Sequence, residues 1–305
     1  MNINEDKLNG LLNGTKVRKI LQGYIKTIGD LGEILEVRIK PIKTYLDSES
    51  FSLVAVYKLK IKTFDGDITV KKIFASAHPT LKKKRDYEIG KSITTELSKN
   101  PARFLKIPKS YVFIQSHGLY LREYVEGETL GQIIKQENGL PDNIAEPLAL
   151  SLIEFQKIKI LPSFEYEARA NFADLNKNIS ILEKQQHPRS QFIHSQFIEV
   201  CKELDQIAEP EIGLSKVLSH GDFNPSNFIL TADKRIAFLD FGSVGFRNYL
   251  WDVARLCSSL KETNFLDIYS RAKGHTLGEK DDKLFTAYQK YFNLLDLTHV
   301  LVWGL

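Results

Sequence analysis

Three polar residues in the second half of the chain constrain its fold most. Asn227 follows Asp222 by five residues, and Asp240 follows Asp222 by eighteen. Between Asn227 and Asp240 lie two apolar runs, Phe228–Leu230 and Ile236–Leu239, separated by a polar segment. This pattern predicts a two-stranded hairpin whose ends carry Asn227 and Asp240, so we expect these two residues to be neighbours in space. The alternative is an ordinary polar turn beside a buried hairpin.

The three side chains match the needs of phosphoryl transfer from ATP. Such a reaction requires a group that orients the attacking hydroxyl and accepts its proton, and oxygen ligands for Mg²⁺. Asp222 fits the first role as the catalytic residue. Asn227 and Asp240 fit the second as metal ligands.

The segments His220–Asn227 and Asp240–Gly242 resemble the catalytic loop and the metal-binding Asp of the kinase-like superfamily. With Gly221 where protein kinases usually have Arg, they resemble its aminoglycoside phosphotransferase and choline kinase branch. The resemblance, which spans roughly residues 35–260, implies an α/β (α+β) protein-kinase-like fold. Its two lobes would be an N-lobe with a mainly antiparallel sheet and a helical C-lobe. It also implies ATP and Mg²⁺ as cofactors and a small-molecule acceptor with a hydroxyl group.

The resemblance and the apolar periodicity together predict the domain organisation. We expect an N-terminal helical extension over residues 1–34, a nucleotide-binding N-lobe over 35–125 and a C-lobe over 126–305. Inserted helices at about 163–215 would shape the acceptor site. The periodicity predicts strands over 33–45 and 51–63, and helices over 15–28, 85–97, 145–158, 172–184 and 191–208.

The hairpin predicted after residue 63 indicates which lysine lies on the buried face of the sheet, where it could bind phosphate. Asp65-Gly66 favours a two-residue turn, which would pair Leu59 with Lys72 on an apolar face and leave Lys71 on the charged face. A buried lysine needs an anionic partner. The superfamily has such a lysine on its third strand, and the pairing argument assigns it to Lys72. Matching the Val-Ala-Ile-Lys pattern of kinases would instead select Lys71.

Further nucleotide contacts follow from the resemblance. Glu88 on helix 85–97 corresponds to the glutamate that pairs with the lysine, with Glu96 as the alternative. The segment Leu46–Ser50 lies where kinases cover the phosphates; it has no glycine, and Ser48 and Ser50 are its predicted contacts. At the hinge, Glu123 and Val125 would hold the adenine through main-chain groups.

Two residues are expected to support the catalytic loop. By resemblance, His220 stabilises the loop without acting as the base. Asp252 corresponds to the family's Asp that holds the backbone of the loop, and it also suits a helix N-cap.

The charge distribution suggests how the two substrates are attracted. Residues 38–109 carry 17 basic and 7 acidic side chains, whereas residues 163–211 carry 5 basic and 9 acidic ones. A basic first part suits ATP, and an acidic insertion suits a cationic or polyhydroxylated acceptor. The acids considered for that acceptor are Glu165, Glu167, Asp174 and Asp296. The alternative is that both segments are ordinary solvated faces, which is how we interpret the run Lys82–Arg85.

The remaining features narrow the class of protein. The chain has no long apolar run, no signal-peptide pattern at its start, and two isolated thiols, Cys201 and Cys257, which predicts a cytoplasmic location. We expect no nucleic-acid or membrane partner and a monomer or weak dimer. Three alternatives remain open: a compact atypical (RIO-like) protein kinase, a nucleotide-binding pseudokinase, and a basic-surface binding module.

Overall fold

The computed structural model describes residues 3–29, 32–48, 50–80, 82–160, 172–208, 216–260 and 264–304. The chain divides into two compact units. The first consists of residues 1–101, 107–126 and 239–242, and the second of residues 102–106, 127–238 and 243–305. Among the described residues, no helix is both long and apolar enough to cross a membrane.

The first unit is an antiparallel sheet with strand order β1-β2-β3-β6-β5, together with four helices. Its helices are α1 (Ile3–Leu11), α2 (Gly14–Gln22), α3 (Ile25–Ile28) and α4 (Lys82–Lys99), and its strands are β1 (Gly32–Leu46), β2 (Phe51–Thr63), β3 (Ile68–Ala77), β5 (Ser110–Ile114) and β6 (Leu119–Glu123). The antiparallel sheet that the sequence predicts is confirmed. The single helix predicted over 15–28 is two helices, because α2 ends at Gln22 with Gly23 as its C-cap, and α3 begins at Ile25.

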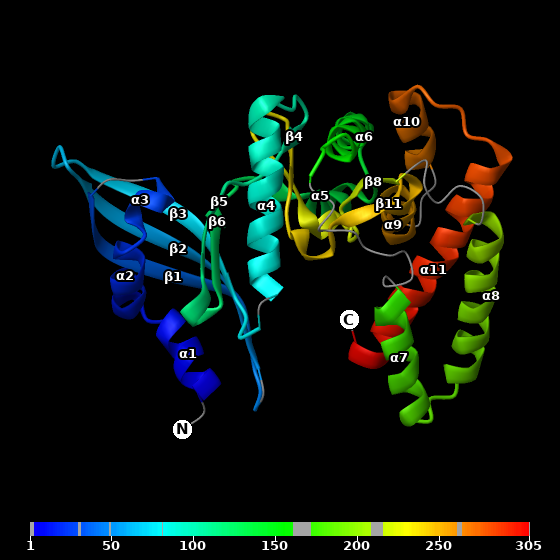
Figure 1. Ribbon diagram of the computed structural model, residues 1–305, viewed down its shortest axis with the longest axis horizontal. Coiled ribbons are helices and arrows are strands. Elements are labelled where there is room, and N and C mark those ends of the chain that lie inside the picture. The colour runs from blue at the N-terminus through cyan, green and yellow to red at the C-terminus, as the bar shows by residue number, and fades with distance from the viewer. Residues whose placement is uncertain are drawn as a thin grey trace. The chain divides into compact units, whose positions relative to one another are not determined.

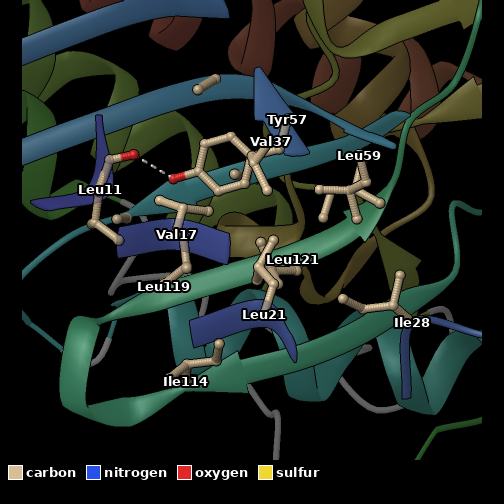
Figure 2. Close-up of a cluster of buried hydrophobic side chains, with 14 of the residues drawn as sticks. Leu11, Val17, Leu21, Ile28, Val37, Tyr57, Leu59, Ile114, Leu119 and Leu121 are labelled. Atoms are coloured by element: carbon tan, nitrogen blue, oxygen red, sulfur yellow. Dashed lines mark hydrogen bonds between the residues drawn. The ribbon is translucent and has the colours of Figure 1, made fainter. Parts of the chain in front are cut away.

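One face of this sheet is covered by α1, α2 and α3, the blue helices of Figure 1. Figure 2 shows Leu11, Val17 and Leu21 from these helices packed against side chains of the sheet. The hydroxyl of the buried Tyr57 donates a hydrogen bond of 2.9 Å to the Leu11 carbonyl oxygen. The N-terminal helices therefore belong to the same hydrophobic core as the strands.

The turn between β2 and β3 differs from the predicted two-residue turn. Thr63 and Asp67 close a three-residue loop, in which Gly66 adopts a φ of 89° that favours glycine. The extra residue moves the register by one, so that Leu59 faces Lys71, and Lys58 faces Lys72. The predicted pairing of Leu59 with Lys72 is therefore wrong, and Lys72 lies on the face opposite to the helices.

The second unit contains a four-stranded sheet, a two-stranded sheet and a set of helices. The four-stranded sheet has the order β4 (Leu105–Lys106), β10 (Ile236–Phe238), β9 (Phe228–Leu230) and β7 (Glu128–Thr129), and the two-stranded sheet pairs β8 (Lys216–Ser219) with β11 (Gly245–Asn248). The helices are α5 (Leu130–Glu137), α6 (Asp142–Gln156), α7 (Ala173–Lys184), α8 (Ser190–Ala208), α9 (Leu250–Leu260), α10 (Asn264–Lys273) and α11 (Glu279–Trp303). Helices α7 and α8 pack against α11, as Figure 1 shows.

The predicted hairpin is confirmed as β9 and β10. Phe228 pairs with Phe238, so Asn227 directly precedes β9, and Asp240 follows β10 by two residues. The helices predicted over 145–158, 172–184 and 191–208 correspond to α6, α7 and α8.

Candidate active site

The loop that precedes β9 positions Asp222 and Asn227 side by side. The Asn227 amide nitrogen donates to the Asp222 main-chain oxygen at 3.0 Å and to Asp222 Oδ2 at 2.9 Å. A short 3-10 turn, Pro225–Asn227, carries Asn227 and is capped by the Asn224 side chain, which accepts from the Ser226 N–H. The Asp222 side chain is about half exposed, at 48%, which leaves its carboxylate accessible to a substrate hydroxyl.

Arg255 on α9 holds a second carboxylate close to Asp222. Its Nη1 donates to both carboxylate oxygens of Asp296, at 2.7 and 2.8 Å, and its Nε lies 3.7 Å from Asp222 Oδ1. The Arg255 side chain is only 9% exposed, so this cation is fixed between the two acids. The charge of Asp296 is therefore already balanced by Arg255.

The backbone of the loop is anchored by Asp252, as the resemblance implies. The Asp252 carboxylate accepts hydrogen bonds from the N–H groups of His220 and Gly221 at 2.8 and 2.9 Å, and from the Ser219 hydroxyl at 3.0 Å. Asp252 is buried; burial raises its pKa, whereas His220, Arg247 and the two N–H donors act in the opposite direction. The expected supporting role of Asp252 is confirmed.

His220 and Gly221 fit the same loop for steric reasons. The His220 ring is buried among the rings of Phe155, Phe223, Phe228 and Phe238, with centroid distances of 5.6 to 6.1 Å. It therefore faces the core and contributes packing. Gly221 has a φ of 83°, and a Cβ atom there would stand 2.1 Å from the Ser243 carbonyl oxygen. No other residue type fits this position without moving the loop.

We expect Asp252→Asn to lower the free energy of unfolding by about 2–5 kcal/mol. The amide keeps one acceptor oxygen and replaces the other with an NH₂ group, which opposes at least one buried donor, such as the His220 N–H, and leaves it unsatisfied. Denaturant unfolding would measure the change, with Asp267→Asn on the exposed surface of α10 as the matched control. Equal stability of the two variants would contradict the anchoring role.

In the first unit, Asp240 lies at the edge of a pocket of about 80 Å³. The pocket is lined by residues from β2, β3, α4 and β6 and by the Asp-Phe-Gly segment: Val54, Phe74, Ser76, Lys83, Asp86, Tyr120, Arg122, Asp240 and Phe241. Asp240 has a φ of 58° and a side chain that is 57% exposed. The volume is enough for several water molecules or a phosphoryl-sized anion.

Lys83 and Asp86, which both line this pocket, form an ion pair. Lys83 Nζ donates to Asp86 Oδ2 at 2.7 Å and lies 4.0 Å from Asp240 Oδ1. Burial lowers the pKa of Lys83, but Asp240 and Asp86 outweigh it and raise the pKa above its ordinary value. Burial raises the pKa of Asp86; Lys83 opposes this, and Asp240 adds to it.

Arg122 is the second cation that lines the pocket. It is buried, its guanidinium lies 3.9 Å from the centroid of the Phe74 ring, and its Nη1 donates to the Glu123 carbonyl oxygen at 3.3 Å. Burial lowers the pKa of Arg122, while Tyr120, Asp240 and Asp86 raise it. The contact with the Phe74 ring and the hydrogen bond to the Glu123 carbonyl oxygen therefore hold Arg122 in place.

The predicted pair of Lys72 and Glu88 is wrong in this structure. Lys72 is exposed and bonds to Glu126 at 2.8 Å, while Glu88 is exposed and lies 3.7 Å from Lys84. The register explains the position of Lys72, because the residues of β3 that line the pocket are Phe74 and Ser76. The string-matching alternative, Lys71, donates to the Ile28 carbonyl oxygen at the end of α3 instead. The other runner-up, Glu96, bonds to Lys99 at 2.7 Å.

The remaining nucleotide contacts stay predictions. The Ser50 N–H donates to Asp47 Oδ1 at 2.6 Å, and Ser48 is exposed in the same loop. An aspartate that caps this loop does not favour a phosphate there, which weakens the predicted role of Ser48 and Ser50. Glu123 ends β6, with its N–H bonded to the Lys109 carbonyl oxygen, and Val125 is buried two residues later.

Of the acids considered for the acceptor, Asp174 is exposed on the first turn of α7, and Asp296 is bonded to Arg255. Glu165 and Glu167 lie outside the described residues. The contribution of this acidic segment to acceptor binding therefore stays a prediction.

The residues Asn227 and Asp240 offer oxygen atoms of the kind that Mg²⁺ prefers. Because the amide nitrogen of Asn227 is used by Asp222, its carbonyl oxygen is the atom available to a cation. Among the described residues, no group of three or more His, Cys, Asp or Glu side chains is arranged to hold a metal. One or two protein oxygens suit Mg²⁺, which usually takes its other ligands from phosphates and water.

Comparisons with known proteins show what the chain as a whole is similar to. No curated protein matches the chain. Spectinomycin phosphotransferase in complex with ADP and spectinomycin has a TM-score of 0.65 at 13% identity, over 94% of this chain and 86% of that chain. A choline/ethanolamine kinase family protein from Mesorhizobium loti has a TM-score of 0.61 at 16% identity, over 94% and 85%. Choline kinase from Streptococcus pneumoniae has a TM-score of 0.55 at 16% identity, over 94% and 97%.

At these identities the structural matches show a shared fold, which confirms the predicted kinase-like α/β architecture. The model of the phosphotransferase enzyme family matches residues 72–284, which is most of the sequence. The chain therefore belongs to the phosphotransferase enzyme family.

Proposed function

We propose that this protein is a small-molecule kinase, which transfers the γ-phosphoryl group of Mg-ATP to a hydroxyl group of its acceptor. The observation that supports the proposal most is the geometry of the loop that contains Asp222. Its carboxylate is accessible, its backbone is anchored by Asp252, and its side chain is oriented by Asn227. A loop built in this way supplies a fixed base for a hydroxyl nucleophile.

In this proposal Asp222 orients the acceptor hydroxyl and takes up its proton. As the acceptor oxygen forms its bond to the γ-phosphorus, the bond from that phosphorus to the bridging oxygen breaks, and ADP leaves with the electron pair. Asn227 and Asp240 would supply oxygen ligands to Mg²⁺, whose charge would offset that of the phosphates. Main-chain groups of Glu123 and Val125 would hold the adenine.

The acceptor class is proposed from the neighbours and from charge. One structural neighbour holds spectinomycin and ADP, and others are choline or ethanolamine kinases. We therefore propose a cationic or polyhydroxylated acceptor, such as an amino alcohol or an aminoglycoside. Of the four acids considered for the acceptor, Asp174 is exposed in the part of the chain that the structure describes, and it would contribute about 0.2–1 kcal/mol as an exposed charge.

A protein substrate fits less well than a small molecule. Only eleven residues separate Asp240 from Asp252, and β11 occupies Gly245–Asn248 of that segment, paired with β8. A protein kinase uses the corresponding segment for a phosphorylated activation loop and a peptide platform. Here the segment is short and already hydrogen-bonded.

The proposed activity is tested with the purified chain and Mg-ATP against a panel of choline, ethanolamine, aminoglycosides and simple sugars. Mass spectrometry would identify a phosphorylated acceptor, and ADP release would give its rate. We expect acceptor-dependent ADP release and one phosphoryl group on the product. Binding of ATP with no transfer to any compound, but transfer to a protein substrate, would favour the atypical protein kinase alternative. Binding of ATP without any transfer would favour the pseudokinase.

A further inference from the structure

We infer that Lys83, on the first turn of α4, binds the phosphates of the nucleotide in place of a lysine on β3, and that Asp86 positions it. The inference rests on the proposed function, because it specifies how that nucleotide is held. Lys83 belongs to the run Lys82–Arg85, which the sequence alone suggests is a solvated surface.

Strand β3 supplies uncharged side chains to the pocket. The β3 residues that line the pocket are Phe74 and Ser76, neither of which carries a positive charge. Lys71 and Lys72 bond to the Ile28 carbonyl oxygen and to Glu126, respectively. Neither of these lysines lines the pocket that contains Asp240.

The Lys83 ammonium group lies near two carboxylates of the pocket. Its side chain is 25% exposed, its ammonium group bonds to Asp86 at 2.7 Å, and it stands 4.0 Å from Asp240, the predicted Mg²⁺ ligand. An ammonium group has three donors, and 4.0 Å is too long for a hydrogen bond. Lys83 therefore lies near the carboxylate that would hold the metal and, with one hydrogen bond to Asp86, retains donors for phosphate oxygens.

Asp86 is buried, with 4% of its surface exposed. Its Oδ1 would lie 3.0 Å from a Cβ atom at Gly242, so the carboxylate packs directly against the Asp-Phe-Gly segment. The resemblance leads us to expect the family's helix glutamate at such a position beside the Asp-Phe-Gly segment. Glu88, however, is exposed and pairs with Lys84. The acid and the lysine that it orients are thus three residues apart on one helix.

Arg122 is less suited to this role, although it is also a cation of the pocket. Its guanidinium is buried against Phe74 and bonded to the Glu123 carbonyl oxygen, so it is committed within the protein. Its charge offsets one of the two carboxylates, Asp86 and Asp240. Lys83 offsets the other and, as the more exposed cation, is the group that can reach a ligand.

The experiment compares Lys83→Met with Lys84→Met, its neighbour on the exposed side of the same turn, and with Lys72→Met. We expect Lys83→Met to weaken binding of Mg-ATP by about 10- to 100-fold, because a charge-assisted hydrogen bond to phosphate is lost. Binding of adenosine should change less than twofold. Lys84→Met and Lys72→Met should bind both ligands as the wild type does, and Lys83→Arg should recover part of the affinity for ATP.

A double-mutant cycle tests the positioning role of Asp86. We expect Asp86→Asn to lower kcat and ATP affinity less than Lys83→Met does, and the double variant to be no worse than Lys83→Met alone. Additive losses would show that Asp86 does not act through Lys83. If a Met variant fails to fold, the Lys83→Arg and Lys83→Gln pair gives the same comparison of charge.

The outcomes separate this inference from the proposed function. If the wild type does not bind Mg-ATP by titration with a fluorescent analogue, both fail. If the wild type binds and transfers, but Lys83→Met retains full affinity and Lys72→Met loses it, the phosphate lysine is on β3 and only the present inference is overturned. Equal losses for ATP and adenosine would show that Lys83 supports the fold of the pocket without touching phosphate.

Discussion

Replacement of Asp222 by Ala is expected to lower kcat by about a thousandfold or more with any accepted acceptor. The carboxylate is the only group proposed to take the proton of the acceptor hydroxyl, and without it the hydroxyl must attack unassisted. The affinity for Mg-ATP should stay within about twofold of the wild type, because the nucleotide contacts proposed here come from other residues. Steady-state kinetics and nucleotide titration measure the two quantities.

Asp222→Asn serves as the isosteric control for this prediction. It keeps the size of the side chain and an oxygen that can accept the 2.9 Å hydrogen bond from Asn227, but it cannot act as a base at neutral pH. We expect the Asn variant to be as inactive as the Ala variant. Substantial activity in Asp222→Asn would show that Asp222 orients the substrate without accepting its proton.

Replacement of Asp240 by Asn is expected to abolish the effect of Mg²⁺ on nucleotide binding and to lower turnover by about a thousandfold. Asn is preferred to Ala here, because Asp240 has a φ of 58°, a left-handed conformation that Asn tolerates. Without Mg²⁺, the variant should bind ATP as tightly as the wild type or more tightly, since one negative charge near the phosphates is gone.

Titration with ATP in the presence of Mg²⁺ or of a chelator separates these effects. The wild type should bind more tightly with Mg²⁺ than without it, and the variant should show no difference. An Asp240→Asn variant that still responds to Mg²⁺ like the wild type would contradict the role of Asp240 as a metal ligand. Asp233→Asn, an exposed acid in the loop between β9 and β10, is the control.

The sequence predicts best the part of the site whose residues are close together along the chain. Asp222 and Asn227 lie five residues apart within one loop, and their geometry is fixed by short-range turns and by the pairing of Phe228 with Phe238. Short separations of this kind leave few alternative arrangements. Asp252 is placed by the resemblance instead, because its carboxylate accepts hydrogen bonds from residues 31 to 33 positions earlier in the chain.

The errors arise where one loop residue decides the outcome. The dipeptide Asp65-Gly66 is typical of a two-residue turn, but in the structure Gly66 is the last residue of a three-residue loop. This difference of one residue shifts the register and exchanges the faces on which Lys71 and Lys72 lie. The role proposed for Lys83 could not be predicted from the sequence, because Lys83 lies within the charged run Lys82–Arg85. Lys83 and Asp86 are three residues apart and can pair on one face of a helix, but this spacing indicates a phosphate site only once the register of β3 has excluded Lys71 and Lys72.

The most direct measurement of the central claim is a single turnover with γ-labelled ATP, the accepted hydroxyl compound and either wild-type protein or Asp222→Asn, at equal nucleotide occupancy. We expect the label to move to the acceptor hydroxyl in the wild type and to stay on ATP in the variant. Transfer of the label at the wild-type rate by Asp222→Asn would contradict the account, as would transfer by the wild type to water or to the protein alone.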